Sequence, residues 1–265
     1  NSDYLTEVEK AEVIRKLNSL NMVTVRPEII NPEIIKILIS TCFKYNNNFT
    51  TLSKGELEQL VNTTINQYDA DNLSNFDSIF RHSNLVKNID ETDTSILSNI
   101  TNIRLKKSSN ITLNKKIGYT NEFGNAFYHP NAQYNKALGG ILSSTGFKVT
   151  GDSVNTQYFD DDGDGNLRRY YLSGSTRIYS DTTAGTVDYT TGKITINALM
   201  FTSTVNTNTT IDFTIIPDSY DVVATRGSLV DISSADVTVK GEIDTIASGE
   251  SSAGVGFSST SSSTY

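Results

Sequence analysis

The spacing of apolar residues changes near residue 108, and this change is what most restricts the fold. Before it, apolar residues recur at helical spacing in some segments and at alternate positions in others. Beyond it the helical period disappears, and the apolar segments are short and rich in Thr. Helices and strands differ in this side-chain period. We therefore predict an α+β fold: a small module of α/β layers over residues 1–107, a β-rich module over 108–247, and a flexible Ser/Gly-rich tail over 248–265.

The first module carries signals for both helices and strands. Apolar residues near helical spacing predict a helix over residues 3–20, and alternation from Glu33 to Tyr45 predicts a strand. The sequence Ser53-Lys-Gly-Glu56 has the form of a capping box, which predicts the start of a second long helix. Ile96 to Lys107 is typical of another strand. Helices on one face of a sheet would accommodate this order.

The second module reads as a series of short strands. Thr190-Thr-Gly192 lies between two alternating segments and predicts a hairpin. The predicted strands are Arg169 to Leu172, Arg177 to Tyr179, Thr186 to Tyr189, Lys193 to Ile196, Ile211 to Ile216, and Val237 to Ile243.

Charge and composition exclude several classes of partner. The net charge is -8, and residues 108–265 hold 10 basic and 16 acidic groups. An acidic chain lacks the basic stripe that nucleic acids or anionic membranes require, so we expect neither partner. The longest apolar run, Ile29 to Phe43, is too short and too polar to span a bilayer. The single cysteine, Cys42, excludes a disulfide within the chain and is expected to be a buried, inert thiol. The chain does not begin with Met, which suggests a fragment.

The acidic segment 159–166 resembles the opening of a calcium-binding loop. The alternating carboxylates that carry this match are Asp160, Asp162 and Asp164. Tyr171, however, occupies the last loop position, where a bidentate Glu is required, and Arg168 occupies the ninth. Asp-Gly turn chemistry explains the same residues, so we predict a hairpin turn between strands at Tyr158 and Leu167, with no metal or other cofactor. Calcium at the three carboxylates is the weaker alternative.

The sequence is poor in groups that could form a catalytic site. Of the two histidines, His82 is predicted to cap the C-terminal end of a short helix, and His129 lies in a loop. Neither has a Ser, Cys or carboxylate at the spacing of a triad or a metal site. We therefore expect no enzyme. A hydrolase built from dispersed carboxylates is the enzymatic alternative.

A short amphipathic helix is predicted to begin near Ser74, with Phe76, Ile79 and Phe80 on one side. Charged residues around it, which could form ion pairs, are Arg81, Lys87, Asp90, Glu91 and Asp93. Amphipathic helices more often bury such aromatic residues in the core than present them to a partner. The alternative is a docking face whose candidate contact residues are Phe76, Phe80, Arg81 and Asp90.

Many short segments, taken in order, resemble the C-terminal part of the baseplate wedge protein of large contractile-tailed bacteriophages. In the first half they are Asp3–Leu5, Pro27, Pro32–Glu33, Leu73–Phe76, Phe80–Ser83, Leu85, Ile89–Asp90, Asp93–Ile96 and Leu105–Lys106. In the second half they are Asp162–Arg168, Tyr170–Tyr171, Gly185–Tyr189 and Gly192–Ile196. The similarity covers most of residues 3–216, and residues 21–107 also resemble the J-type baseplate proteins of simpler contractile tails.

This resemblance implies a non-enzymatic structural protein of the virion tail baseplate, assembled in the host cytoplasm. Members of the family form homodimers that close into a ring around the central hub. Other baseplate wedge proteins bind that ring, which rearranges when the tail contracts. From the resemblance we expect that the family's N-terminal part is not included in this sequence. The alternative function is that of a β-rich extracellular binding module, in which the acidic loop holds calcium or a sugar.

Overall fold

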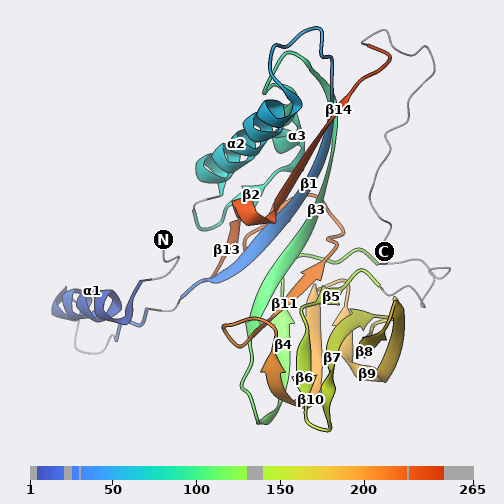
Figure 1. Ribbon diagram of the computed structural model, residues 1–265. Helices are drawn as coiled ribbons and strands as arrows, with labels where there is room; N and C mark the ends of the chain where they lie inside the picture. Colours follow the sequence, from blue (N-terminus) through green and yellow to red (C-terminus); the bar gives the residue numbers. More distant parts are fainter. Residues whose placement is uncertain are drawn as a thin grey trace. The chain divides into compact units, whose positions relative to one another are not determined.

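A computed structural model describes residues 5–20, 26–29, 31–73, 75–129, 140–225 and 227–247 (Figure 1). The chain divides into two compact units, residues 1–33 and 34–265. The tail predicted over 248–265 lies outside the described residues. None of the helices in the described ranges is long and apolar enough to cross a membrane.

The first unit contains the helix α1 (Glu7–Leu20), which confirms the helical prediction for this region. Its start is fixed by a reciprocal pair of contacts. The backbone N–H of Thr6 donates to the Glu9 carboxylate at 2.8 Å, and the backbone N–H of Glu9 donates to the Thr6 hydroxyl at 3.3 Å. None of the side chains of α1 is buried.

The second unit begins with a long antiparallel pair. Strand β1 (Glu33–Tyr45) pairs with β3 (Ile96–Asn110), and β14 (Val237–Ile243) runs parallel to β1. Ile35, Ile37 and Ile39 are buried on one face of β1, as the alternating pattern predicts.

Two helices cover the buried face of this pair: α2 (Lys54–Asn72) packs on β14, and α3 (His82–Asp90) packs on β3 (Figure 1). The predicted capping box at the start of α2 is confirmed. The Ser53 hydroxyl accepts from the N–H of Glu56, and the Glu56 carboxylate accepts from the N–H of Ser53.

The predicted starting point of the short helix is wrong. Residues 79–80 form the strand β2 (Ile79–Phe80), and α3 begins only at His82. Asp77 has a φ of 60°, a left-handed conformation that a helix cannot contain. Strand β2 pairs with β12 (Val222–Val223), which lies far along the chain, so no local pattern indicates it. His82 therefore lies at the start of α3 and does not cap its C-terminal end. Ser74 itself is outside the described residues.

The rest of the second unit is almost entirely β-structure, and one circuit of strands closes on itself. The remaining elements are β4 (Lys116–Glu122), β5 (Ser143–Ser144), β6 (Phe147–Val149), β7 (Asp152–Asp161), β8 (Asn166–Ser173), β9 (Thr176–Asp188), β10 (Lys193–Thr204), β11 (Thr210–Ile215), β13 (Ser228–Asp231) and a 3-10 turn (Ser234–Asp236). The order β7-β6-β10-β9-β8 is closed by a pairing of β8 with β7. We call these five strands the closed sheet.

The predicted strands fall within this framework, with one difference. Residues 177–179 and 186–189 were expected to form two strands, but β9 runs through both and ends at Asp188. The predicted hairpin at 190–192 is confirmed, because Lys193 of β10 pairs with Asp188 of β9. The α+β prediction is confirmed in part: the described residues form both helices and strands, and strands predominate. The module boundary after residue 107 falls inside β3 and stays a prediction.

Gly185 in β9 tests how tightly the closed sheet is packed. A methyl group at this position would lie 2.0 Å from the backbone oxygen of Thr195, so the neighbouring backbone would have to move. We expect Gly185→Ala to lower the free energy of unfolding by about 2 kcal/mol or more. Gly55→Ala in α2 is the control, because no atom lies within 4 Å of the added methyl group. It should be neutral or stabilise by about 0.5 kcal/mol. Urea unfolding that gives both variants the same midpoint would contradict this account.

Candidate interaction surface

The two-stranded ribbon of β2 and β12 separates an inner from an outer face. Phe80 and Val222 are fully buried beneath it, whereas Ile79 and Val223 pair with each other on the outside and are 40% and 44% exposed. Phe76 precedes Ile79 by three residues and is 63% exposed, and Tyr220 precedes Val223 by three and is 44% exposed. Three residues span at most about 11 Å, so the backbone of Phe76 and that of Tyr220 lie within that distance of the ribbon. We call Phe76, Ile79, Tyr220 and Val223 the ribbon patch.

Side chains from elsewhere hold both edges of the ribbon. The amide of Asn125 donates to the carbonyl of Val223 and accepts from its N–H, both at 3.0 Å. On the other edge, the Tyr68 hydroxyl donates to the carbonyl of Arg81 and accepts from its N–H, both at 3.1 Å. These backbone groups are therefore already paired, and a partner would meet the ribbon through its side chains.

Arg81 lies at the rim of the patch and forms an ion pair. Its Nη1 is 2.6 Å from Oδ2 of Asp221, and the N–H of His82 donates to Oδ1 of the same carboxylate at 3.2 Å. The hydrogen bond from Arg81 lowers the pKa of Asp221 below its ordinary value. Because both side chains are well exposed, solvent screens this pair and it adds little stability. The His82 ring also packs against Tyr220, with 4.8 Å between ring centroids.

The four predicted contact residues do not lie together. Phe76 and Arg81 belong to the ribbon surface, but Phe80 is fully buried and packs edge-on against Tyr68. Asp90 is partly buried and accepts a hydrogen bond from Asn99 at 2.8 Å. Phe80 is thus a core residue, and a contact role for the other three stays a prediction. The sequence did not indicate that Ile79 faces outward, nor that Tyr220, Asp221 and Val223 belong to the same surface. Only the pairing of β2 with β12 brings them together, and no local pattern signals it.

The acidic segment forms the predicted hairpin between β7 and β8, but Asp160 is not in its turn. It lies in β7, is 1% exposed, and accepts from Arg168 at 3.0 Å, Arg177 at 2.8 Å and the Tyr179 hydroxyl at 2.9 Å. Burial raises its pKa, while the positive charge of Arg168 acts in the opposite direction. We call Asp160, Arg168, Arg177 and Tyr179 the aspartate cluster. It joins three adjacent strands of the closed sheet.

The neighbouring carboxylates are also engaged by the protein. Asp161 accepts from the N–H of Leu142 at 2.9 Å and from the Tyr189 hydroxyl at 2.6 Å. Asp162 holds the turn by accepting from the N–H groups of Asp164 and Asn166. Within the described ranges, no group of three or more His, Cys, Asp or Glu side chains is arranged to hold a metal ion.

The remaining reactive side chains have structural surroundings. The Nε2 atom of His82 is 2.9 Å from the carbonyl oxygen of Thr101, and the His129 ring stacks on Tyr189 at 4.5 Å. Cys42 is only partly buried, whereas a buried thiol was predicted, because its side chain lies on the face of β1 opposite to the helices. Burial nevertheless raises the pKa of its thiol, which favours the unreactive protonated form.

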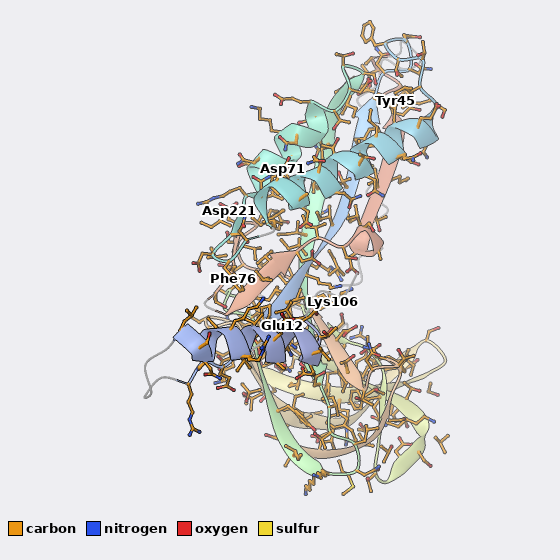
Figure 2. The ribbon with its side chains drawn as sticks, turned by 90° about the vertical axis from the view of Figure 1, so that its left-hand side faces the viewer. Glu12, Tyr45, Asp71, Phe76, Lys106 and Asp221 are labelled. Atoms are coloured by element: carbon orange, nitrogen blue, oxygen red, sulfur yellow. The ribbon has the colours of Figure 1, made fainter. Side chains whose placement is uncertain are left out.

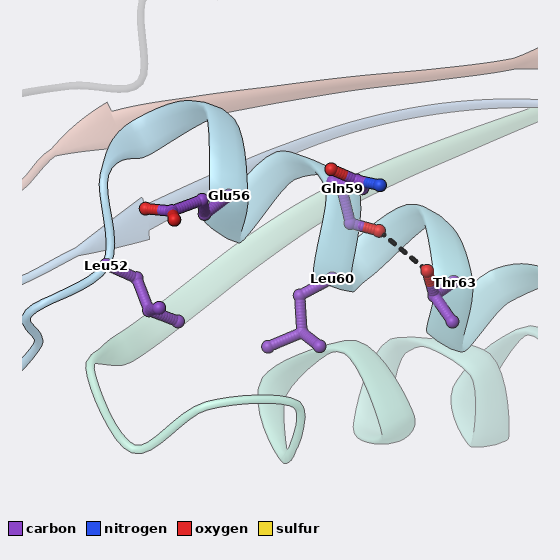
Figure 3. Close-up of a pocket in the computed structure, with 5 residues that line it drawn as sticks. All are labelled: Leu52, Glu56, Gln59, Leu60 and Thr63. Atoms are coloured by element: carbon purple, nitrogen blue, oxygen red, sulfur yellow. Dashed lines mark hydrogen bonds between the residues drawn. The ribbon is translucent and has the colours of Figure 1, made fainter.

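A shallow depression of about 310 Å³ lies along α2 (Figure 3). Its lining residues are Leu52, Glu56, Gln59, Leu60 and Thr63. The Glu56 carboxylate already belongs to the capping box, and the Thr63 hydroxyl donates to the carbonyl of Gln59 at 2.9 Å. The depression therefore lacks the pair of carboxylates that a hydrolase would need.

Phe80 and Phe76 should respond very differently to truncation. Phe80→Ala removes a fully buried ring and should lower the free energy of unfolding by about 3–5 kcal/mol. Phe76→Ala is the matched control and should change it by less than about 0.5 kcal/mol, because its ring is largely exposed. Thermal unfolding followed by circular dichroism measures both. Equal destabilisation by the two variants would show that this description of the ribbon is wrong.

The aspartate cluster gives a second test, which also addresses calcium. Asp160→Asn removes the negative charge that pairs with two poorly exposed guanidinium groups and should cost about 3–5 kcal/mol. Asp162→Asn retains an acceptor for the turn and should cost less than about 1 kcal/mol. We expect the melting temperature of the wild-type chain to be the same in calcium and in EDTA. A calcium-dependent rise that Asp162→Asn abolishes would favour the calcium-loop alternative.

Comparison with known families gives a match for the first part of the second unit. Residues 34–108 match the family model described as baseplate structural protein gp6, C-terminal domain III. The matched range contains α2, β2 and α3 together with nearly all of β1 and β3. A search of curated proteins finds no match to the chain. The match places this chain in the phage tail baseplate as a structural protein, with residues 34–108 similar to C-terminal domain III of gp6.

Proposed function

We propose that this baseplate protein is a self-associating wedge subunit. Two copies pair, pairs close into a ring around the central hub, and other wedge proteins bind that ring. The match of residues 34–108 to domain III of gp6 carries this proposal, because it ties the chain to a structural role in the baseplate. The relation of residues 21–107 to J-type baseplate proteins is part of the same proposal.

The mechanism involves contacts between surfaces and no bond chemistry. A closed ring needs contacts that repeat with rotational symmetry, and a pair of identical subunits meets through the same surface on each copy. Rearrangement on tail contraction requires that some contacts have two alternative packings of similar energy. Surfaces of mixed apolar and charged character are compatible with such contacts.

Helix α1 offers one such surface for a second copy. Val13, Leu17 and Leu20 follow each other at helical spacing and are 38%, 38% and 82% exposed. An isolated helix of 14 residues is marginally stable in water, so a partner for this apolar stripe would stabilise it. Its first turn is acidic, and Arg15 and Lys16 lie in its second half. An antiparallel pair of α1 helices would thus bring opposite charges together.

Light scattering on the eluting protein over a wide range of concentrations tests self-association. We expect a dimer or a larger homo-oligomer, unaffected by calcium or EDTA. The double variant Leu17→Ser and Leu20→Ser should weaken association at least tenfold. Val8→Ser, at a position that is 79% exposed and lies off the stripe, should not. A wild-type chain that is monomeric at every concentration would overturn the proposal. Equal association by all three proteins would exclude α1 as the contact.

A further inference from the structure

The ribbon patch is an apolar surface whose four side chains are 40% to 63% exposed. It exposes two aliphatic side chains on the ribbon itself and two aromatic side chains in the segments that lead into it. Single exposed apolar residues are ordinary on protein surfaces, but a contiguous group of large ones marks an interaction site. Aromatic residues in particular are enriched where proteins contact each other.

Carboxylates surround this patch. Asp77 precedes Ile79 by two residues, Asp218 precedes Tyr220 by two, and Asp221 adjoins β12. Asp71, in the last turn of α2, precedes Phe76 by five residues; in the view of Figure 2 it lies above Asp221, and Asp221 lies above Phe76.

The charges around the patch do not balance. Among the described residues that flank the ribbon, Arg81 is a cation, and it is already paired with Asp221. The last turn of α2 contains no basic residue, so the negative end of its dipole adds to the field of Asp71 and is not neutralised by a cation there. Among the described residues that flank the ribbon, the carboxylates therefore outnumber the cations.

This charge distribution decides between possible occupants. A second copy that met the patch through its own patch would bring like charges together, which opposes association. An anionic membrane or a nucleic acid would be repelled for the same reason. Addition of a strand to either edge would have to displace the side chains of Asn125 and Tyr68 from the backbone. The remaining occupant is a protein surface that is both apolar and basic.

We propose that the ribbon patch docks a basic, apolar segment of another baseplate protein. Apolar side chains of that segment cover Ile79 and Val223, and its Lys or Arg side chains face Asp77 and Asp218. The proposal rests on the proposed function in so far as it requires further baseplate proteins to be partners of this chain. It differs from self-association because the two use different surfaces.

A pair of synthetic peptides serves as the probe. In one peptide lysine alternates with leucine, and in the other glutamate replaces every lysine. Fluorescence anisotropy with the full chain measures both affinities at low and at moderate salt. We expect the lysine peptide to bind at least tenfold more tightly, with an affinity that falls as salt rises. Equal affinities for the two peptides would overturn the proposal.

Matched variants show whether the peptide binds at the ribbon. Ile79→Ser with Val223→Ser, or Asp77→Asn with Asp218→Asn, should each lower the affinity at least tenfold. Asparagine suits position 77 because it tolerates the left-handed conformation found there. Val154→Ser with Val205→Ser is the control for the loss of exposed apolar side chains. Glu91→Gln with Glu122→Gln is the control for the loss of two exposed negative charges. Unchanged melting temperatures exclude unfolding as the cause. Equal losses in ribbon and control variants would contradict the proposal.

Light scattering on the same ribbon variants separates this inference from self-association. The proposal predicts that they associate like the wild-type chain. Loss of association in these variants would show that a second copy occupies the patch, and would overturn the proposal. A wild-type chain that stays monomeric yet binds the lysine peptide at the ribbon would contradict self-association and support the docking surface.

Discussion

The rest of the structure depends on the position of β3 between two partners. This strand pairs with β1 along one edge from Ile96 to Lys107, and with β11 along the other from Leu105 to Asn110. Leu105 and Lys107 have partners on both sides. The helices α2 and α3 pack on one end of this framework, and the closed sheet continues from the other through β11, β5 and β7. All of the buried apolar side chains of the second unit except Tyr170 accordingly form one cluster.

The closed sheet has a second organising contact in the aspartate cluster. Asp160 and Arg168 are directly opposed in the β7–β8 register, and Arg177 and Tyr179 reach the same carboxylate from β9. A shift of one residue in any of these strands would separate the buried charges, which is very unfavourable in a low-dielectric interior. We interpret the cluster as fixing the register of three strands. We therefore expect the closed sheet to act as a rigid scaffold, and contacts with other baseplate proteins to be made by residues on the surface.

Much of the fold follows from local patterns in the sequence. The alternation in β1, the capping box of α2 and the hairpin after β9 are each determined by residues close together in the chain. The start of α3 could not be predicted, because β2 replaces the expected first turn and forms only by pairing with a strand more than a hundred residues away. The ribbon patch was missed for the same reason. Asp160 was assigned to a turn because its two arginine partners are not signalled by any motif.

Calorimetry of the full chain tests the central claim, that β3 joins the helix-bearing part and the closed sheet into one cooperative unit. The account predicts a single unfolding transition for residues 34–247, with a calorimetric enthalpy equal to the van't Hoff enthalpy. Two separate transitions, with the closed sheet and the helix-bearing part melting independently, would contradict it. Such a result would support instead a module boundary close to residue 107.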